Sequence, residues 1–302
     1  MMLTLPLSSL LPPVAPVNVA VARILFCAFL LSRIDNYLNF VSYLRFPVEL
    51  FTPNGALVSL EVAHWVAAHR TELGVLWKTA TVFGLVGLFT TPALVVSSAI
   101  GFLFLSFPQA FQANLYLYLP LISLGAFLAL SAAGDALSVD QWWRERRGAP
   151  PVLPAARHAL FFRLGQFLFV FFIFSSGYFK LTKTGAEWIF SDNLRNTFLC
   201  SPFTRIDFVP GVFSGLGLNA WVAQFSTLSR ALAFCTVLAQ LLTPLALVHR
   251  QAARAALLFF VSFQLAALLL LFIDSSVNLV LYLPWFDAGG FWARWQAWRC
   301  KE

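Results

Sequence analysis

From residue 163 to residue 190 the chain reads RLGQFLFVFFIFSSGYFKLTKTGAEWIF. Apolar side chains fill most of its first half, and the small residues 175–177 and Lys180 then precede an aromatic segment. About 20 consecutive apolar residues suffice for an α-helix to cross the hydrocarbon core of a bilayer. We therefore predict a transmembrane helix over 159–179 that ends beside Lys180.

The rest of the chain has a similar composition. Of its 302 residues, 60% are apolar and 11% are charged, and 33 are Phe and 10 are Trp. Soluble domains carry about 25% charged residues. This composition excludes a soluble globular protein and predicts an all-α integral membrane protein, with a single domain over 1–302 and no separate soluble domain.

Apolar segments bounded by charges, Pro or Gly predict the membrane spans. We expect seven, at 15–32, 75–91, 93–108, 115–133, 159–179, 229–248 and 254–273. An eighth segment, SSVNLVLYLPWF (275–286), contains Pro284 and is too short to cross alone. It is interpreted as a half-span, a re-entrant segment or a continuation of the preceding helix, which leaves open whether 275–291 crosses the membrane. The sequence therefore predicts a polytopic bundle of about seven or eight transmembrane helices.

Basic residues between the apolar segments predict the orientation. Arginines gather in 142–157 and 249–254, and cytoplasmic loops carry the excess of Lys and Arg, so both loops are predicted to be cytoplasmic. The longest loops, 33–74 and 180–228, then lie on the outer side, where their aromatic and charged residues predict interfacial helices. We expect the plasma membrane, which in bacteria is the inner membrane.

The formal net charge of +7 comes from Lys and Arg residues scattered over the ends of apolar segments. A nucleic-acid-binding protein would gather them on one solvated stripe. The expected partner is therefore the lipid membrane, with no nucleic acid.

Lys180 is the candidate catalytic residue, and two interpretations of it stay open. An amine walled by aromatic side chains is costly to charge, and a neutral amine can accept a proton. Alternatively, the side chain snorkels to the lipid headgroups, as lysines at span ends commonly do.

Two carboxylates, Asp135 and Asp140, flank Ser138 at the end of a predicted span. Paired carboxylates can carry out acid and base chemistry. Four arginines follow, however, at 144, 146, 147 and 157. We therefore interpret the segment as a structural ion-pair cluster rather than a catalytic site.

Several polar residues lie within or beside the predicted spans, where such groups commonly line a pocket or hold helices together. They are Arg23, Arg163, Gln240, Gln264, Asp274 and Asn278. The four His and four Cys show no metal-ligand spacing, so no metal site is predicted. Cys200 and Cys300 would form a disulfide only in an oxidising compartment.

Three segments occur in order along the chain: FTPNG (51–55), NLYLYLP to SAAGDALSVD (114–140) and FSSGYFKLTKTGAEW (174–188). Together they resemble the membrane part of the vitamin K-dependent gamma-carboxylase and the bacterial horizontally transferred transmembrane (HTTM) family, with DoxX-like proteins more distant. The sharpest matches are the structural motif Ser138-Val139-Asp140, and Gly177-x-x-Lys180-Leu181 followed by Trp188.

The resemblance implies that Lys180 is the base that deprotonates reduced vitamin K, so that oxygen can attack it. The implied cofactor is thus a reduced quinone, whose flat ring suits an aromatic wall. The residues implied for its pocket are Gly177, Tyr178, Trp188, Asn114 and Tyr118. A separate peptide or protein would be the substrate that is carboxylated.

Three features depart from the carboxylase pattern. The chain ends at Glu302 without a large luminal domain, Leu115 stands where the carboxylase has a His, and Gln264 stands where bacterial relatives often carry a His. A quinol-binding enzyme therefore competes with a non-enzymatic accessory protein for the maturation, export or immunity of a secreted peptide. A transporter is the third option, although the halves of the chain show no inverted repeat.

Overall fold

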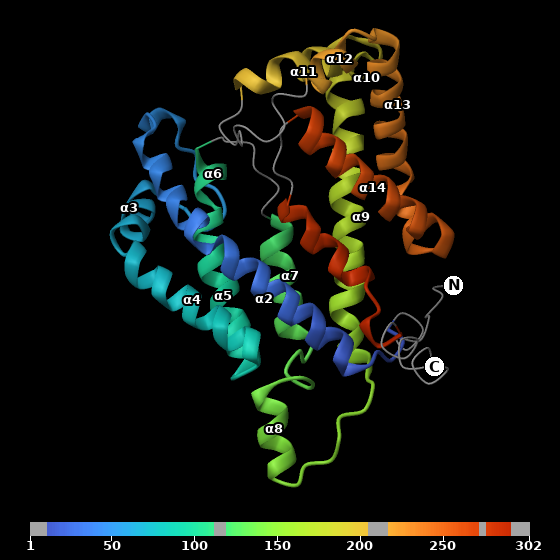
Figure 1. Cartoon of the computed structure of the whole chain (residues 1–302). Coiled ribbons are helices and arrows are strands. Elements are labelled where there is room, and N and C mark those ends of the chain that lie inside the picture. Colours follow the sequence, from blue (N-terminus) through green and yellow to red (C-terminus); the bar gives the residue numbers. More distant parts are fainter. Residues whose placement is uncertain (1–10, 112–118, 205–216, 272–275, 291–302) are drawn as a thin grey trace, which may run out of the picture. The chain divides into compact units, whose positions relative to one another are not determined.

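A computed structural model of the chain describes residues 11–111, 119–204, 217–271 and 276–290 (Figure 1). Within these ranges the chain is helical and forms no β-strand, with only two isolated β-bridges, Val14 to Ala155 and Asn54 to Leu57. The all-α class is thereby confirmed. The predicted pocket residues Asn114 and Tyr118 lie outside the described residues.

The chain divides into two compact units, 1–165 with 280–302, and 166–279. The single domain over 1–302 stays a prediction. The helices of the first unit are α2 (Pro16–Leu38), η1 (Asn39–Arg45), η2 (Val48–Leu50), α3 (Leu60–Ala68), α4 (Arg70–Val86), α5 (Thr90–Leu105), α6 (Phe107–Ala110), α7 (Leu119–Leu130) and α8 (Val139–Arg146). The helix η6 (Ser276–Trp285) ends in this unit.

The core of the first unit lies where α2, α4, α5 and α7 pack together. Trp77 of α4 is fully buried there. Its ring stacks on Phe104 of α5, with centroids 5.7 Å apart, and on Tyr37 of α2, with centroids 6.2 Å apart. Burying aromatic rings of this size stabilises the unit through removal of apolar area from water and through ring packing.

The second unit is built from the larger part of α9 (Ala156–Thr184) and the helices that follow it. These are α10 (Glu187–Phe190), α11 (Asn193–Thr204), α12 (Leu218–Ala223), α13 (Ser226–Leu242), η5 (Thr243–Leu247) and α14 (Arg250–Leu271). Phe169 of α9 meets Phe260 of α14 edge to face, with centroids 5.9 Å apart. A second cluster joins Phe198 of α11 to Val222 and Ala223 of α12.

Among the described residues, five helices are long and apolar enough to cross a membrane. They cover Pro16–Arg45, Thr90–Ala110, Ala156–Thr184, Ser226–Leu247 and Arg250–Leu270. The expected count of seven or eight is therefore not confirmed. The predicted 75–91 span falls on α4, which has 17 residues and ends at Gly87 in the left-handed conformation.

One further predicted span, 115–133, and the uncertain segment 275–286 are not among these five helices. The 115–133 span is described from Leu119, where α7 has 12 residues. The 275–286 segment forms the 10-residue 3-10 helix η6, with Pro284 inside it. Short helices occur in the described parts of both predicted outer loops, and their place in a membrane interface stays a prediction.

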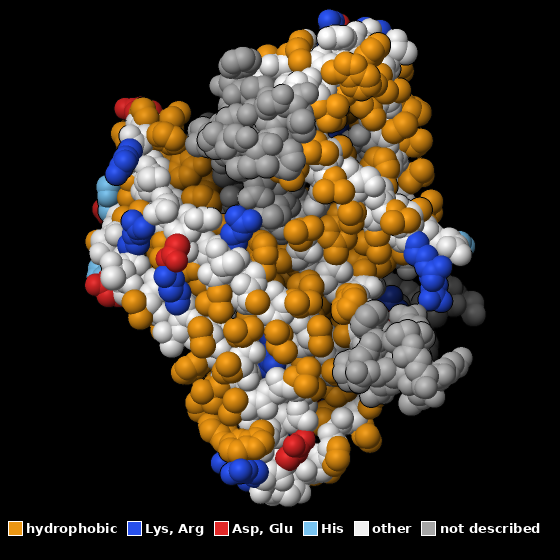
Figure 2. All heavy atoms as spheres, in the orientation of Figure 1, with side chains coloured by type: hydrophobic (Ala, Val, Ile, Leu, Met, Phe, Trp, Pro, Cys, Tyr) orange, Lys and Arg blue, Asp and Glu red, His pale blue; other side chains and the backbone are white. Residues whose placement is uncertain are grey.

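Large apolar side chains remain exposed along the long helices, and Figure 2 shows hydrophobic atoms over much of the visible surface. In the second unit Phe171 of α9 is 58% exposed and Leu258 of α14 is 71% exposed. A water-soluble protein of this size would leave such patches uncovered at a cost, whereas lipid tails cover them. The surface therefore has the character that a lipid environment requires.

Candidate functional site

Lys180 lies in the last turns of α9, and its side chain is turned toward α13. Its Nζ donates a hydrogen bond to Oε1 of Gln240, 2.9 Å away. Gln240 is buried, with 4% of its surface exposed. A lysine that snorkels extends its amine toward water, whereas this amine is bound to a buried amide.

Small residues on α9 let Gln240 approach Lys180. Ser176 and Lys180 are one helical turn apart and share a face, and Nε2 of Gln240 donates to Oγ of Ser176 across 3.4 Å. Between them, a Cβ at Gly177 would stand 2.7 Å from the Cβ of Gln240. No side chain larger than hydrogen fits at Gly177 without moving α13, so the glycine allows the amide to reach the lysine.

Trp188 of α10 completes this arrangement. The Nζ of Lys180 lies 4.7 Å from the centroid of its ring, within the range of a cation–π interaction. The turn that brings Trp188 back follows the end of α9 at Thr184 and passes through Gly185, whose φ is +63°. The Lys180 site is defined here as Lys180, Gln240, Ser176, Gly177 and Trp188.

The Lys180 site lacks a counter-charge within the part of the chain that the structure describes, because no carboxylate there forms an ion pair with Lys180. The amide oxygen of Gln240 accepts a hydrogen bond from an ammonium and from a neutral amine alike. A carboxylate would instead hold the lysine in its charged form. The site can therefore keep the amine oriented before and after it takes a proton. The Trp188 ring stabilises the ammonium form of Lys180.

The structure brings together only part of the predicted pocket. Gly177 and Trp188 both lie in the Lys180 site. Tyr178 is 50% exposed, and its ring stacks on Phe174 of the same helix, with centroids 6.1 Å apart. Gln240 is a member that the sequence did not assign to this site, although it stands out as a polar residue in an apolar run.

The motif Ser138-Val139-Asp140 ties α8 to the start of α5. Oγ of Ser138 accepts a hydrogen bond from the backbone N–H of Gln141 at 2.9 Å and so caps the N-terminus of α8. Oδ1 of Asp140 accepts from the N–H of Phe89 at 2.9 Å, and Oδ2 accepts from the N–H and the hydroxyl of Thr90 at 2.8 and 2.7 Å. A carboxylate at the N-terminus of α5 also complements the helix dipole.

Arg23 of α2 lies beside this motif and is fully buried. Its Nη2 donates to the carbonyl oxygen of Leu137 at 2.6 Å, while Nε and Nη1 find no hydrogen-bond partner among the described residues. A Cβ on Gly87 would collide with Nη1 of Arg23 and with Ser138. A glycine is therefore required at position 87 for two reasons: its φ is left-handed, at +74°, and the buried guanidinium of Arg23 leaves no room for a Cβ.

Asp135 gathers three basic side chains, and these four residues are named here the Asp135 cluster. Its Oδ1 lies 2.6 Å from Nη1 of Arg144, and its Oδ2 lies 2.5 Å from Nη2 of Arg157 and 2.9 Å from Nε2 of His158. Burial raises the pKa of the Asp135 carboxyl, but hydrogen bonds from His158 and Arg144 and the charges of Arg157 and Arg144 outweigh it, so the pKa is lowered. His158 is a member that the sequence did not indicate. Asp140 forms no ion pair with a described residue, and its carboxylate instead accepts hydrogen bonds from backbone N–H groups.

The remaining polar residues of the predicted spans differ in exposure. Arg163 is exposed, and Gln264 and Asn278 are half-buried. Asp274 and Cys300 lie outside the described residues. No three His, Cys, Asp or Glu side chains in the described ranges are grouped as metal ligands would be.

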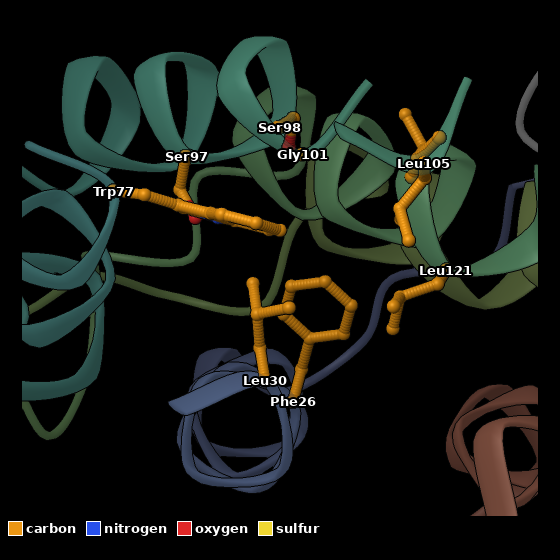
Figure 3. Close-up of a pocket in the computed structure, with 9 residues that line it drawn as sticks. Phe26, Leu30, Trp77, Ser97, Ser98, Gly101, Leu105 and Leu121 are labelled. Carbon is orange, nitrogen blue, oxygen red and sulfur yellow. The ribbon is translucent and has the colours of Figure 1, made fainter. Parts of the chain in front are cut away.

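A small cavity lies in the first unit between α2, α4, α5 and α7. Figure 3 shows Phe26 and Leu30 of α2 pointing toward Trp77, with Ser97, Ser98 and Gly101 of α5 on the other side. The cavity has room for about one water molecule. The indole N–H of Trp77 is buried without a hydrogen-bond partner in the described part of the chain. The cavity therefore suits one water molecule and is far too small for a quinone ring.

Comparison of the chain with protein-family models, with curated proteins and with solved structures finds no match. The geometry itself defines a helical protein whose described part holds five helices long and apolar enough to cross a membrane, and a lysine bound to a buried amide.

Proposed function

We propose that this chain is an integral membrane protein that binds a reduced quinone at the Lys180 site and uses Lys180 as a base. The observation that carries the proposal is the hydrogen bond between Lys180 and the buried amide of Gln240, with Trp188 beside the amine. Five apolar helices and their exposed apolar side chains support the membrane placement. The resemblance to the membrane part of the vitamin K-dependent gamma-carboxylase and to HTTM proteins supports the choice of ligand.

The length of α9 fits a helix that crosses the membrane. Arg157 stands at its beginning and Lys180 near its end, which at about 1.5 Å per residue puts roughly 35 Å of helix between them. The hydrocarbon core of a bilayer is about 30 Å thick. If the arginines of 142–157 and 249–254 lie in the cytoplasm, Lys180 then lies at the outer interface.

Each residue of the site has a role in this proposal. A bound hydroquinone supplies phenolic protons and the electrons that reduce oxygen. The neutral amine of Lys180 accepts one phenolic proton at Nζ. Gln240 holds that nitrogen in place, and Trp188 offers an apolar face that stabilises the resulting ammonium. The donor set fits a phenol, because an amine, an amide and an aromatic face are all present and no carboxylate in the described ranges pairs with the amine.

The test uses full-length protein in lipid nanodiscs, supplied with reduced vitamin K and oxygen. The product is the quinone epoxide, detected by mass spectrometry. Lys180→Ala is expected to abolish epoxide formation. Lys183→Ala is the matched control, because Lys183 is an exposed lysine in the last turn of the same helix. It is expected to retain wild-type turnover.

Epoxide formation by Lys180→Ala at the wild-type rate would overturn the proposal. So would equal loss in both variants, because the effect would then follow from charge at the end of α9 and not from the site. Absence of epoxide and of retained quinone in folded wild-type protein, together with a co-purified peptide, would favour an accessory role in the maturation, export or immunity of that peptide.

A further inference from the structure

The Asp135 cluster carries more positive than negative charge. The backbone N–H of Ala155 donates to Nδ1 of His158 at 3.2 Å. His158 is therefore the neutral tautomer that donates its Nε2–H to Asp135. One carboxylate then faces two guanidinium groups, those of Arg144 and Arg157, so one positive charge is left without a counter-charge inside the cluster.

The two arginines that carry this excess charge are partly exposed, while the residues that hold them are buried. Asp135 is 6% exposed and His158 is fully buried, whereas the side chains of Arg144 and Arg157 are 40% and 54% exposed. The buried carboxylate fixes two guanidiniums that remain open on their outer sides. Guanidinium groups held in this way are suited to bind phosphate oxygens, because each presents several N–H donors in a fixed fork.

The adjoining helix α8 carries further exposed aromatic and basic side chains. Trp142 and Trp143 are 46% and 39% exposed, and the guanidinium of Arg146 lies 3.9 Å from the Trp142 ring centroid. Arg147 follows at the end of the helix and is also exposed. In Figure 2, Lys or Arg side chains lie beside hydrophobic ones at the end of the molecule where Figure 1 labels α8. Tryptophan prefers the headgroup region of a bilayer, and arginine reaches its phosphates.

We propose that this α8 surface, formed by Arg144, Arg146, Arg147, Arg157, Trp142 and Trp143, binds the headgroup of an anionic phospholipid. Charge complementarity selects the phosphate, and the exposed rings select a lipid over a soluble anion. The place of the surface fits a lipid, since Asp140 of α8 binds the first residues of the candidate span at Thr90, and Arg157 begins the candidate span of α9. The site requires the membrane placement proposed above and does not depend on Lys180.

The test measures lipid binding by native mass spectrometry. Full-length protein in a neutral detergent is titrated with phosphatidylglycerol or with phosphatidylcholine of the same acyl chains. The wild type is expected to retain phosphatidylglycerol in preference. Arg146→Gln/Arg147→Gln is expected to weaken that binding by about 25-fold, since each of the two basic residues near an anionic headgroup contributes about fivefold. Neither arginine pairs with Asp135, so the fold is expected to survive, as a thermal melt would show.

Two controls separate this site from general charge effects. Arg250→Gln/Arg254→Gln removes the same charge from the other basic loop, at two exposed positions, and is expected to leave the preference unchanged. Arg146→Lys/Arg147→Lys keeps the charge and is expected to retain most of the binding. Equal losses in both Gln double variants, or no loss in Arg146→Gln/Arg147→Gln, would overturn the proposal.

Free glycerol phosphate distinguishes a lipid from a soluble anion. At the same concentration as the lipid it is expected not to displace phosphatidylglycerol, and displacement would overturn the assignment to a lipid. The measurement uses no quinone. A negative result in the lipid-binding test therefore does not bear on the role of Lys180. A negative result with the Lys180 variants likewise does not bear on lipid binding by the α8 surface.

Discussion

The Nζ of Lys180 and the Oε1 of Gln240 lie 2.9 Å apart although 60 positions separate the two residues in the chain. Gly177 makes this possible, since a Cβ there would stand 2.7 Å from Gln240. The contact joins an ionisable group to a partner that cannot ionise. The chemistry of the lysine is therefore sensitive to any charge introduced at position 240.

We expect Gln240→Glu to abolish proton acceptance by Lys180. The new carboxylate would pair with the amine and hold it as an ammonium, which has no lone pair for a phenolic proton. Epoxide formation from reduced vitamin K measures the effect, and the variant is expected to fall to the level of Lys180→Ala. Gln264→Glu, a half-buried position on α14, is the control. Wild-type turnover in Gln240→Glu would contradict the role assigned to Lys180.

We expect Asp140→Ala to destabilise the first unit by about 1 to 3 kcal/mol, because the N–H groups of Phe89 and Thr90 lose their acceptor. Asp140→Asn keeps one oxygen acceptor and is expected to cost less. Titration with a denaturing detergent gives the free energy of unfolding. Asp35→Asn is the comparison, since Asp35 is 75% exposed and its pair with Lys78 is expected to contribute little. Equal stability of Asp140→Ala and Asp35→Asn would refute the capping role.

The sequence predicted the helical class and the approximate position of several spans because these depend on local composition. A run such as 159–179 is apolar enough that no tertiary contact is needed to make it a helix. The length of α4 was harder to predict. Its apolar run continues past Gly87, and the helix ends there because the glycine takes a left-handed φ and the chain turns back to α5.

The sites were predictable only where a single residue stood out from its surroundings. Lys180, Asp135 and Asp140 are ionisable residues next to apolar runs, and each was recognised. Two partners of Asp135, Arg144 and Arg157, belonged to the predicted ion-pair cluster because they follow closely in the chain. Gln240, His158 and Thr90 were not assigned as partners, because they lie on other elements and no periodicity links them to these residues. Such pairs depend on how helices cross, which side-chain packing decides.

Gly87 and Gly148 allow the contact with Arg23 to be measured separately from backbone strain. Both have a positive φ, +74° and +75°, but a Cβ on Gly87 meets Arg23 and Ser138 whereas a Cβ on Gly148 meets nothing within 4 Å. Gly148→Ala is expected to cost about 1 kcal/mol from strain alone. Gly87→Ala is expected to cost at least about 2 kcal/mol more, because the packed neighbours must move. Equal costs in a detergent unfolding titration would show that the contact with Arg23 is not tight.

The Asp135 cluster predicts how stability depends on pH. Its partners lower the pKa of Asp135 in the folded protein, whereas an unfolded Asp titrates at about 3.9. As the pH falls through about 4, the unfolded chain takes up a proton before the folded one does, so the stabilisation from this carboxylate is present above that pH and is lost below it. Asp135→Asn cannot titrate, so the difference in melting temperature between wild type and variant is expected to shrink from pH 6 toward pH 3. A difference that stays constant over this range would show that Asp135 is not the group whose protonation weakens the fold.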